Sequence, residues 1–267
     1  MKLNTTLICL LFSTLQAHAG DCEFEPWTKY RATNLYKHPS TAAYLFHSTS
    51  VKVDADGAPN AYHPDDLELH CTKGVGFKGL DCPANAGYPK STWWSSALLP
   101  DPSNPKRAYV QPASSQYAGF FVSQTSLFDG TKAKTDYARY VDSRNVPYLV
   151  FPGKFNAMSG TGVMGDFGYA INVDTGKASP FVVAEVGPPN AELGEMSIAL
   201  ATALGGTNPN PRTGAGTPNG KTIYVMFPRS RAQPAWPRSN EQIATRVNEL
   251  LLAVGGQASV INCKAVP

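Results

Sequence analysis

The sequence is poor in charge. Only 16% of its 267 residues are Asp, Glu, Lys or Arg, against about 25% in an average soluble domain. The net charge of +3 is too small for a nucleic-acid binder that relies on bulk electrostatics. After the N-terminal segment, no apolar run reaches the roughly 18 residues that a membrane span requires. We therefore expect a soluble protein with neither a nucleic-acid nor a membrane partner.

Several catalytic and cofactor motifs are also missing. The chain has no Gly-x-Ser-x-Gly elbow, no His-Glu-x-x-His helix, no Walker loop and no Rossmann glycine pattern after a strand. The histidines after the N-terminal segment are His38, His47, His63 and His70. These absences argue against serine hydrolases, zinc proteases and nucleotide-binding enzymes. We expect no cofactor and no metal.

Glycine and proline, by contrast, are abundant. The chain has 23 glycines and 22 prolines, which argues against a coiled coil or a helical bundle. Hydrophobic residues make up 42%, enough for a sizeable core and too many for a disordered chain. The composition is typical of a loop-rich, mainly β globular protein.

Residues 1–19 have the pattern of a secretory signal peptide. Lys2 precedes an apolar run, and Ala17-His18-Ala19 forms an A-x-A cleavage site before Gly20. The alternative is a buried N-terminal helix. We expect cleavage near Ala19, a secreted or periplasmic protein, and one domain over residues 20–267 that acts as a monomer.

Four cysteines follow this segment, and an even number in an exported chain predicts two disulfides with three possible connectivities. Cys71 and Cys82 bracket a short glycine-rich loop, whereas Cys22 and Cys263 lie near the two ends of the mature chain. The ends of a domain are often close together. We therefore favour the pairs Cys71–Cys82 and Cys22–Cys263.

Short β-branched or aromatic runs between turn residues predict strands. They lie at about 43–48, 50–54, 118–123, 146–151, 167–173, 179–186, 221–227 and 258–262. Apolar spacing predicts two helices, over 195–204 and 240–253, and Ser239 and Gln242 have capping-box spacing at the start of the second. The pattern indicates a mainly β, α+β single domain with long loops, built on a β-barrel or β-sandwich core.

Two carboxyl groups flank one Gly/Pro loop. Glu185 ends the most apolar strand candidate, and Glu195 begins the first predicted helix. Glycoside hydrolysis needs such a pair, one to protonate the leaving oxygen and one to activate water. Desolvation by the apolar strand would raise the pKa of Glu185, and a helix N-terminus would favour ionised Glu195. Glu185 is thus the better acid and Glu195 the better base, although strand-end and helix-start glutamates are also common without a function.

Other residues are weaker candidates. Asp54 and Asp56 resemble the start of a calcium loop, but the further acidic ligands are absent, and a turn is the simpler interpretation. Asp166, just before a predicted strand, is a third candidate carboxyl for the cleft. Trp93 and Trp94 lie in a proline-rich loop and are candidates for stacking on sugar rings, or for packing. Because adjacent residues of an extended segment point in opposite directions, one of them would face a cleft.

Four segments together resemble the core of glycoside hydrolase family 75, the fungal-type chitosanases and their bacterial relatives. They are Tyr148 to Gly153, Gly165 to Ala170, Ala184 to Pro188 and Leu193 to Leu200. Val53 to His63, Gly79-Leu80-Asp81, Asn85-Ala86-Gly87 and Ala138 to Asp142 resemble the N-terminal part of the bacterial members. The resemblance extends from about residue 50 to residue 227.

The resemblance implies an endo-acting, inverting hydrolase of β-1,4-linked glucosamine polymers, on a six-stranded double-psi β-barrel. Glu195 matches the family's Gly-Glu-x-Ser glutamate. Glu185 stands where the family has its catalytic aspartate. The extra methylene could displace the carboxyl by about 1 Å, which can cost on the order of 100-fold in rate. We also assign Asp54, Asp56, His63, Trp93 and Trp94 to substrate binding.

The expected partner is therefore chitosan or another amino-sugar polymer. The slightly basic chain would also suit an anionic polymer such as peptidoglycan, unless Asp54, Asp56, Asp166, Glu185, Glu192 and Glu195 make the cleft locally acidic. Two other hypotheses about the function remain open. One is a carbohydrate- or peptidoglycan-binding protein that lost turnover, and the other is a secreted effector or inhibitor without a sugar site.

Overall fold

The computed structural model describes residues 22–266, so the predicted signal peptide lies outside the described residues. A nine-stranded mixed sheet forms the body, in the order β1-β2-β3-β11-β8-β9-β7-β10-β4. Its strands are β1 (Glu25–Tyr30), β2 (Thr33–Lys37), β3 (Tyr44–Ser48), β4 (Lys52–Asp54), β7 (Tyr148–Pro152), β8 (Phe167–Asn172), β9 (Ala178–Gly187), β10 (Glu195–Ser197) and β11 (Thr222–Phe227).

Helices cover both faces of this sheet. One face packs against α4 (Asn240–Leu252) and α5 (Gly256–Asn262), which bury Ile243, Val247 and Val260 against it. The other face packs against α2 (Gly153–Asn156) and α3 (Ile198–Ala203), with Phe155 and Leu200 fully buried. None of the helices in residues 22–266 is long and apolar enough to cross a membrane.

The mainly β, α+β class is confirmed, but the predicted barrel is not. Within the described residues the sheet is open, because its edge strands β1 and β4 do not pair with each other. Two predicted strands are wrong: 258–262 belongs to helix α5, and 118–123 makes only isolated bridges. The β1–β2 hairpin, which was not predicted, instead extends the sheet beyond β3.

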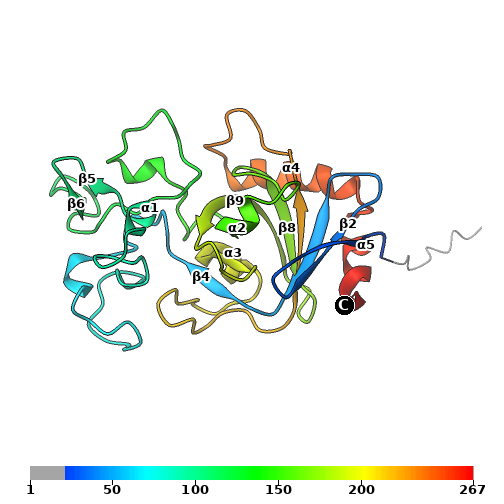
Figure 1. Cartoon of the computed structure of the whole chain (residues 1–267), viewed down its shortest axis with the longest axis horizontal. Helices are drawn as coiled ribbons and strands as arrows, with labels where there is room; N and C mark the ends of the chain where they lie inside the picture. Colours follow the sequence, from blue (N-terminus) through cyan, green and yellow to red (C-terminus); the bar gives the residue numbers. More distant parts are fainter. Residues whose placement is uncertain (1–21, 267) are drawn as a thin grey trace, which may run out of the picture.

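Residues 55–140 form a lobe inserted between β4 and β7 (Figure 1). It contains α1 (Trp94–Ala97), β5 (Pro100–Asp101), β6 (Asn104–Ala108) and the 3-10 turns Pro64–Asp66 and Tyr137–Arg139. A third 3-10 turn, Cys263–Ala265, ends the body. The lobe has its own small apolar cluster around Tyr62, Trp94 and Phe121.

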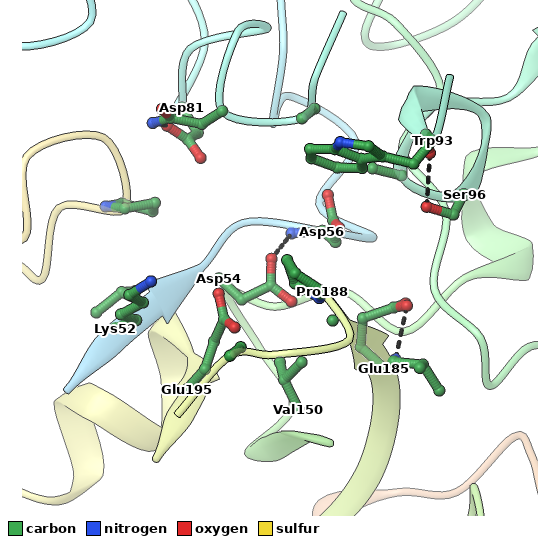
Figure 2. Close-up of a pocket in the computed structure, with 18 of the residues that line it drawn as sticks. Lys52, Asp54, Asp56, Asp81, Trp93, Ser96, Val150, Glu185, Pro188 and Glu195 are labelled. Atoms are coloured by element: carbon green, nitrogen blue, oxygen red, sulfur yellow. Dashed lines mark hydrogen bonds between the residues drawn. The ribbon is translucent and has the colours of Figure 1, made fainter. Parts of the chain in front are cut away.

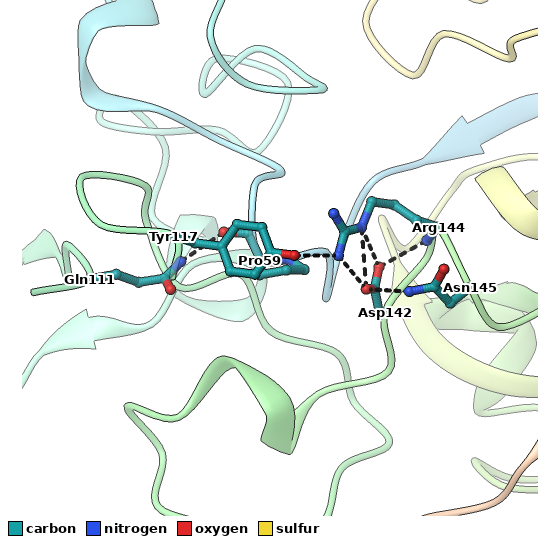
Figure 3. A network of polar contacts seen from close by, with 6 residues as sticks. All are labelled: Pro59, Gln111, Tyr117, Asp142, Arg144 and Asn145. Carbon is teal, nitrogen blue, oxygen red and sulfur yellow. Dashed lines mark hydrogen bonds and ion pairs between the residues drawn. The ribbon is translucent and has the colours of Figure 1, made fainter. Parts of the chain in front are cut away.

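A polar network joins the lobe to the segment that leads into β7 (Figure 3). The Arg144 guanidinium donates to both carboxylate oxygens of Asp142 and to the hydroxyl of Tyr117 in the lobe. Within the lobe, the Gln111 amide donates to the carbonyl of Pro59 at 2.7 Å. The hydrogen bond from Arg144 to Tyr117 therefore connects the lobe to the segment before β7.

The structure pairs Cys22 with Cys263 and Cys71 with Cys82, as predicted. The first disulfide ties the start of the described chain to the end of α5, and the second closes a loop of the lobe. Two disulfides are typical of a protein from an oxidising compartment.

Candidate active site

A cleft of about 710 Å³ lies between the β4 edge of the sheet and the lobe. Its sheet side carries Glu185, Glu195 and Asp54, and its opposite side carries Asp81 and Trp93 (Figure 2). The remaining lining residues are Val51, Lys52, Val53, Asp56, Tyr62, Asn85, Ala86, Ser96, Ala97, Val150, Val186, Gly187, Pro188, Pro189, Ala191, Pro211 and Gly214. The two predicted catalytic glutamates therefore face the same space.

Strand register brings these glutamates into one row. Val150 on β7 pairs with Glu185 on β9. On the other side of β7, Leu149 pairs with Met196, so the antiparallel register sets Val150 opposite Glu195. Residues that pair across neighbouring strands form a row, and their side chains project from the same face of the sheet. Neighbouring strands are about 4.8 Å apart. The two glutamate backbones are thus about 10 Å apart, two strand spacings.

A register shift in β9 turns Glu185 toward the cleft. Leu149 pairs with Val183, but Val150 pairs with Glu185, so Ala184 is an extra residue. Simple alternation from Val183 would put Glu185 on the face covered by α2 and α3. The shift moves it to the face of Val150, as bulges beside active sites often do. No sequence pattern reveals this shift.

The carboxyl group of Glu185 is buried, with 4% of the residue exposed. The backbone N–H and hydroxyl of Ser126 donate to it at 2.7 and 2.8 Å, and the N–H of Val186 donates at 2.8 Å. Burial, reinforced by the nearby charge of Asp54, raises the pKa of Glu185 to about 8 against these hydrogen bonds. The direction of this pKa shift is the one expected from the apolar strand, and the role of Glu185 as proton donor stays a prediction.

Asp54 is a third carboxyl on the sheet side of the cleft. The Tyr148 hydroxyl lies 3.0 Å from its Oδ2, and the N–H of Asp56 donates to its Oδ1 at 2.8 Å. Burial and the charge of Glu195 raise the pKa of Asp54 to about 7. The pKa of Asp54 therefore depends on the charge of Glu195, and the pKa of Glu185 depends on the charge of Asp54.

The lobe adds two acidic residues. The hydroxyls of Tyr62 and Ser123 donate to Oδ1 of Asp56 at 2.9 and 3.1 Å, and burial raises the pKa of Asp56 well above its usual value. Asp81 accepts from Cys82 N–H and the Asn85 amide, and burial raises its pKa to about 6. Asp81 was not predicted as a site residue, although the segment Gly79-Leu80-Asp81 is part of the family resemblance.

Glu195 is not at a helix N-terminus, which corrects the sequence prediction. It begins strand β10, and helix α3 starts only at Ile198, after Ser197 as N-cap. Met196 and the apolar residues of α3 together have helical spacing, so the sequence pattern did not indicate this short strand. Burial raises the pKa of Glu195, the charge of Lys52 lowers it, and Asp81 raises it.

The two tryptophans point to different places, but the segment is not extended as the sequence analysis assumed, because Trp93 is the N-cap of α1 and Trp94 begins this helix. Trp93 lines the cleft and is 46% exposed, whereas Trp94 is buried against Tyr88. Trp94 is therefore a packing residue and not a sugar platform. Gly87, at φ +75°, leaves the space that the Trp93 ring occupies, since a Cβ there would lie 2.8 Å from the ring.

Three other predicted cleft residues lie outside the cleft lining. Asp166 is fully buried and accepts hydrogen bonds from the N–H groups of Val163, Arg229 and Arg231, so it shapes two turns. His63 caps a 3-10 turn, where its ring accepts from Asp65 N–H and packs on Phe120. Glu192 forms an ion pair with Arg31.

No group of three or more His, Cys, Asp or Glu side chains within residues 22–266 is arranged to hold a metal ion. No protein-family model matches this sequence, and no curated protein matches it significantly. The resemblance to family 75 therefore remains a prediction, and the function is inferred from the site alone.

Proposed function

We propose that this protein is an inverting glycoside hydrolase that cleaves β-1,4 bonds in glucosamine-containing polymers. Glu195 activates water and Glu185 protonates the glycosidic oxygen. The observation that carries the proposal is the row in which Val150 separates Glu185 from Glu195 on one face of one cleft.

The spacing supports inversion. Inverting enzymes hold their two carboxyl groups roughly 6.5–9.5 Å apart, which leaves room for a water molecule, whereas retaining enzymes hold them at about 5–5.5 Å. Two strand spacings separate the two backbones by about 10 Å, and both side chains leave the sheet on the same face. The arrangement suits the inverting geometry better than the retaining one.

The protons balance over one turnover. Glu195 accepts a proton from the water that attacks the anomeric carbon, and Glu185 gives its proton to the departing sugar hydroxyl. The burial that raises the pKa of Glu185 to about 8 keeps it protonated at neutral pH. Exchange with solvent then restores both groups.

Charge favours a cationic polymer over an anionic one. Five carboxyl groups and one lysine line the cleft, although the whole chain has a net charge of +3. Glu185 is protonated in this mechanism and burial raises the pKa of Asp56 well above its usual value, so the negative charge of the cleft comes from Asp54, Asp81 and Glu195. An acidic cleft attracts the ammonium groups of glucosamine units and repels the carboxylates of peptidoglycan. Trp93 adds a face on which a sugar ring can stack.

The test is sugar release from chitosan, chitin and purified peptidoglycan by the wild type and by Glu195→Gln, Glu185→Gln and Glu192→Gln. We expect release from chitosan, a loss of at least 100-fold in the first two variants, and no change in Glu192→Gln, whose residue pairs with Arg31 outside the cleft lining. NMR of the first product should show the α-anomer.

Other outcomes contradict the proposal in different ways. Equal release by the wild type and Glu195→Gln removes Glu195 from the mechanism. Binding of a polymer without release indicates the binding protein considered from the sequence. Glutamates that point into solvent on opposite faces would have supported the effector or inhibitor hypothesis, whereas Glu185 and Glu195 line the same cleft.

A further inference from the structure

One positively charged residue, Lys52, lies in the row that Glu185, Val150 and Glu195 form across the sheet. Lys52 on β4 is the register partner of Glu195 on β10, so both side chains leave the sheet on the same face. Both line the cleft, where Figure 2 shows them side by side. Among the cleft-lining residues in the described part of the chain, Lys52 is the one lysine or arginine.

Ionised Glu195 is opposed from several sides. Asp54 lies two residues beyond Lys52 on β4, and Asp81 faces Glu195 from the lobe and raises its pKa. Glu185 lies across Val150 in the same row but is protonated in the proposed mechanism, so it adds no charge. Asp56 adds a further carboxyl to the same cleft. Burial acts in the same direction, because a desolvated carboxyl favours its neutral form. A base must nevertheless be ionised before it can accept a proton from water.

Within residues 22–266, no cation is among the charges that shift the pKa of Glu185. Its hydrogen-bond donors are the neutral groups of Ser126 and Val186, and the strongest charge acting on it is that of Asp54. A single lysine at one end of the row therefore makes the two glutamates electrostatically unequal.

We propose that Lys52 is a positioning residue whose charge keeps Glu195 ionised, and thereby assigns the base role to Glu195 and the acid role to Glu185. Its part in catalysis rests on the proposed function, whereas the effect of its charge on the pKa of Glu195 does not. The charge of Lys52 opposes burial and Asp81 in setting the pKa of Glu195. Lys52 is exposed and acts through the field of its charge, so salt should weaken its effect.

The primary test follows the titration of Glu195 by NMR of carbon-labelled glutamate carboxyls, with Glu195→Gln to identify the signal. We expect Lys52→Gln to raise the midpoint by about 0.5–1 pH unit, and Lys52→Arg to leave it near the wild-type value. The difference should shrink in 1 M salt, where the screening length is about 3 Å. Lys29→Gln, on β1 at the opposite edge of the sheet, is the matched control and should change nothing.

Kinetics provide the second measurement. In Lys52→Gln, the acid limb of kcat/KM on chitosan should move upward with the Glu195 midpoint, and Lys52→Arg should restore it. An unchanged Glu195 midpoint in Lys52→Gln overturns the inference, even if the protein hydrolyses chitosan. If the wild type releases no sugar but the Glu195 midpoint still shifts in Lys52→Gln, the proposed function is contradicted. The effect of the Lys52 charge on Glu195 is then still supported.

Discussion

Two glutamates ten positions apart in the chain have opposite electrical surroundings. Glu185 is buried among neutral donors and beside Asp54, and its pKa is raised to about 8. Glu195 shares its strand pair with Lys52, whose charge opposes the effect of burial. Different environments for two carboxyl groups are how one site holds an acid and a base at the same pH.

The pH dependence of activity follows from these shifts. Glu185 must be protonated, so kcat/KM should fall as the pH rises through about 8. Glu195 must be ionised, and its raised pKa should put the acid limb above the ordinary glutamate value of about 4.3. A pH profile on chitosan measures both limbs. Full activity at pH 10 would contradict the role of Glu185.

Stability provides the same information without a substrate. A carboxyl group whose pKa is higher in the folded than in the unfolded protein stabilises the folded state most at pH values below its pKa in the unfolded protein. This stabilisation is lost as the pH rises through the pKa in the folded protein. The melting temperature of Glu185→Gln relative to the wild type should therefore increase between pH 5 and pH 9.

At the scale of elements, periodicity predicted what local patterns can determine. The apolar runs of β7, β8, β9 and β11 and the amphipathic helix α4 were predicted close to their observed bounds. The sequence could not show that residues 258–262 form a helix, because Val260 and Ile261 favour a strand locally but pack against the core as part of α5. Nor could it show the shift at Ala184, which depends on the neighbouring strand.

The start of α4 gives a test at this scale. Ser239 Oγ accepts from the N–H of Gln242, and the Gln242 side chain accepts from the N–H of Ser239. Ser239→Ala removes one half of this capping box and should cost about 1 kcal/mol in urea unfolding. Thr245→Ala, at an exposed position within the helix, is the control and should be neutral or slightly stabilising. Equal losses in both variants would contradict the role of the cap.

At the scale of the molecule, the cleft depends on segments that are distant in sequence. Asp54 and Asp81 precede β7 by many residues, yet they face Glu185 and Glu195, which follow it. Sequence analysis found both glutamates because one loop joins them, and it missed Asp81 because the position of the lobe is a tertiary property. The network of Arg144, Asp142 and Tyr117 helps to fix that position.

The two disulfides should therefore separate stability from function. In the chain-entropy model, the disulfide between Cys22 and Cys263, with a separation of 241 residues, contributes about 5.5 kcal/mol to stability. The disulfide between Cys71 and Cys82, with a separation of 11 residues, contributes about 3 kcal/mol. The Cys82 N–H donates to Asp81 in the cleft wall. We expect the double variant Cys22→Ala/Cys263→Ala to lose more stability in urea unfolding than the double variant Cys71→Ala/Cys82→Ala. We expect the second variant to lose more activity on chitosan than the first, by about tenfold if Asp81 moves. Parallel losses in both double variants would show that the lobe loop does not position the cleft wall.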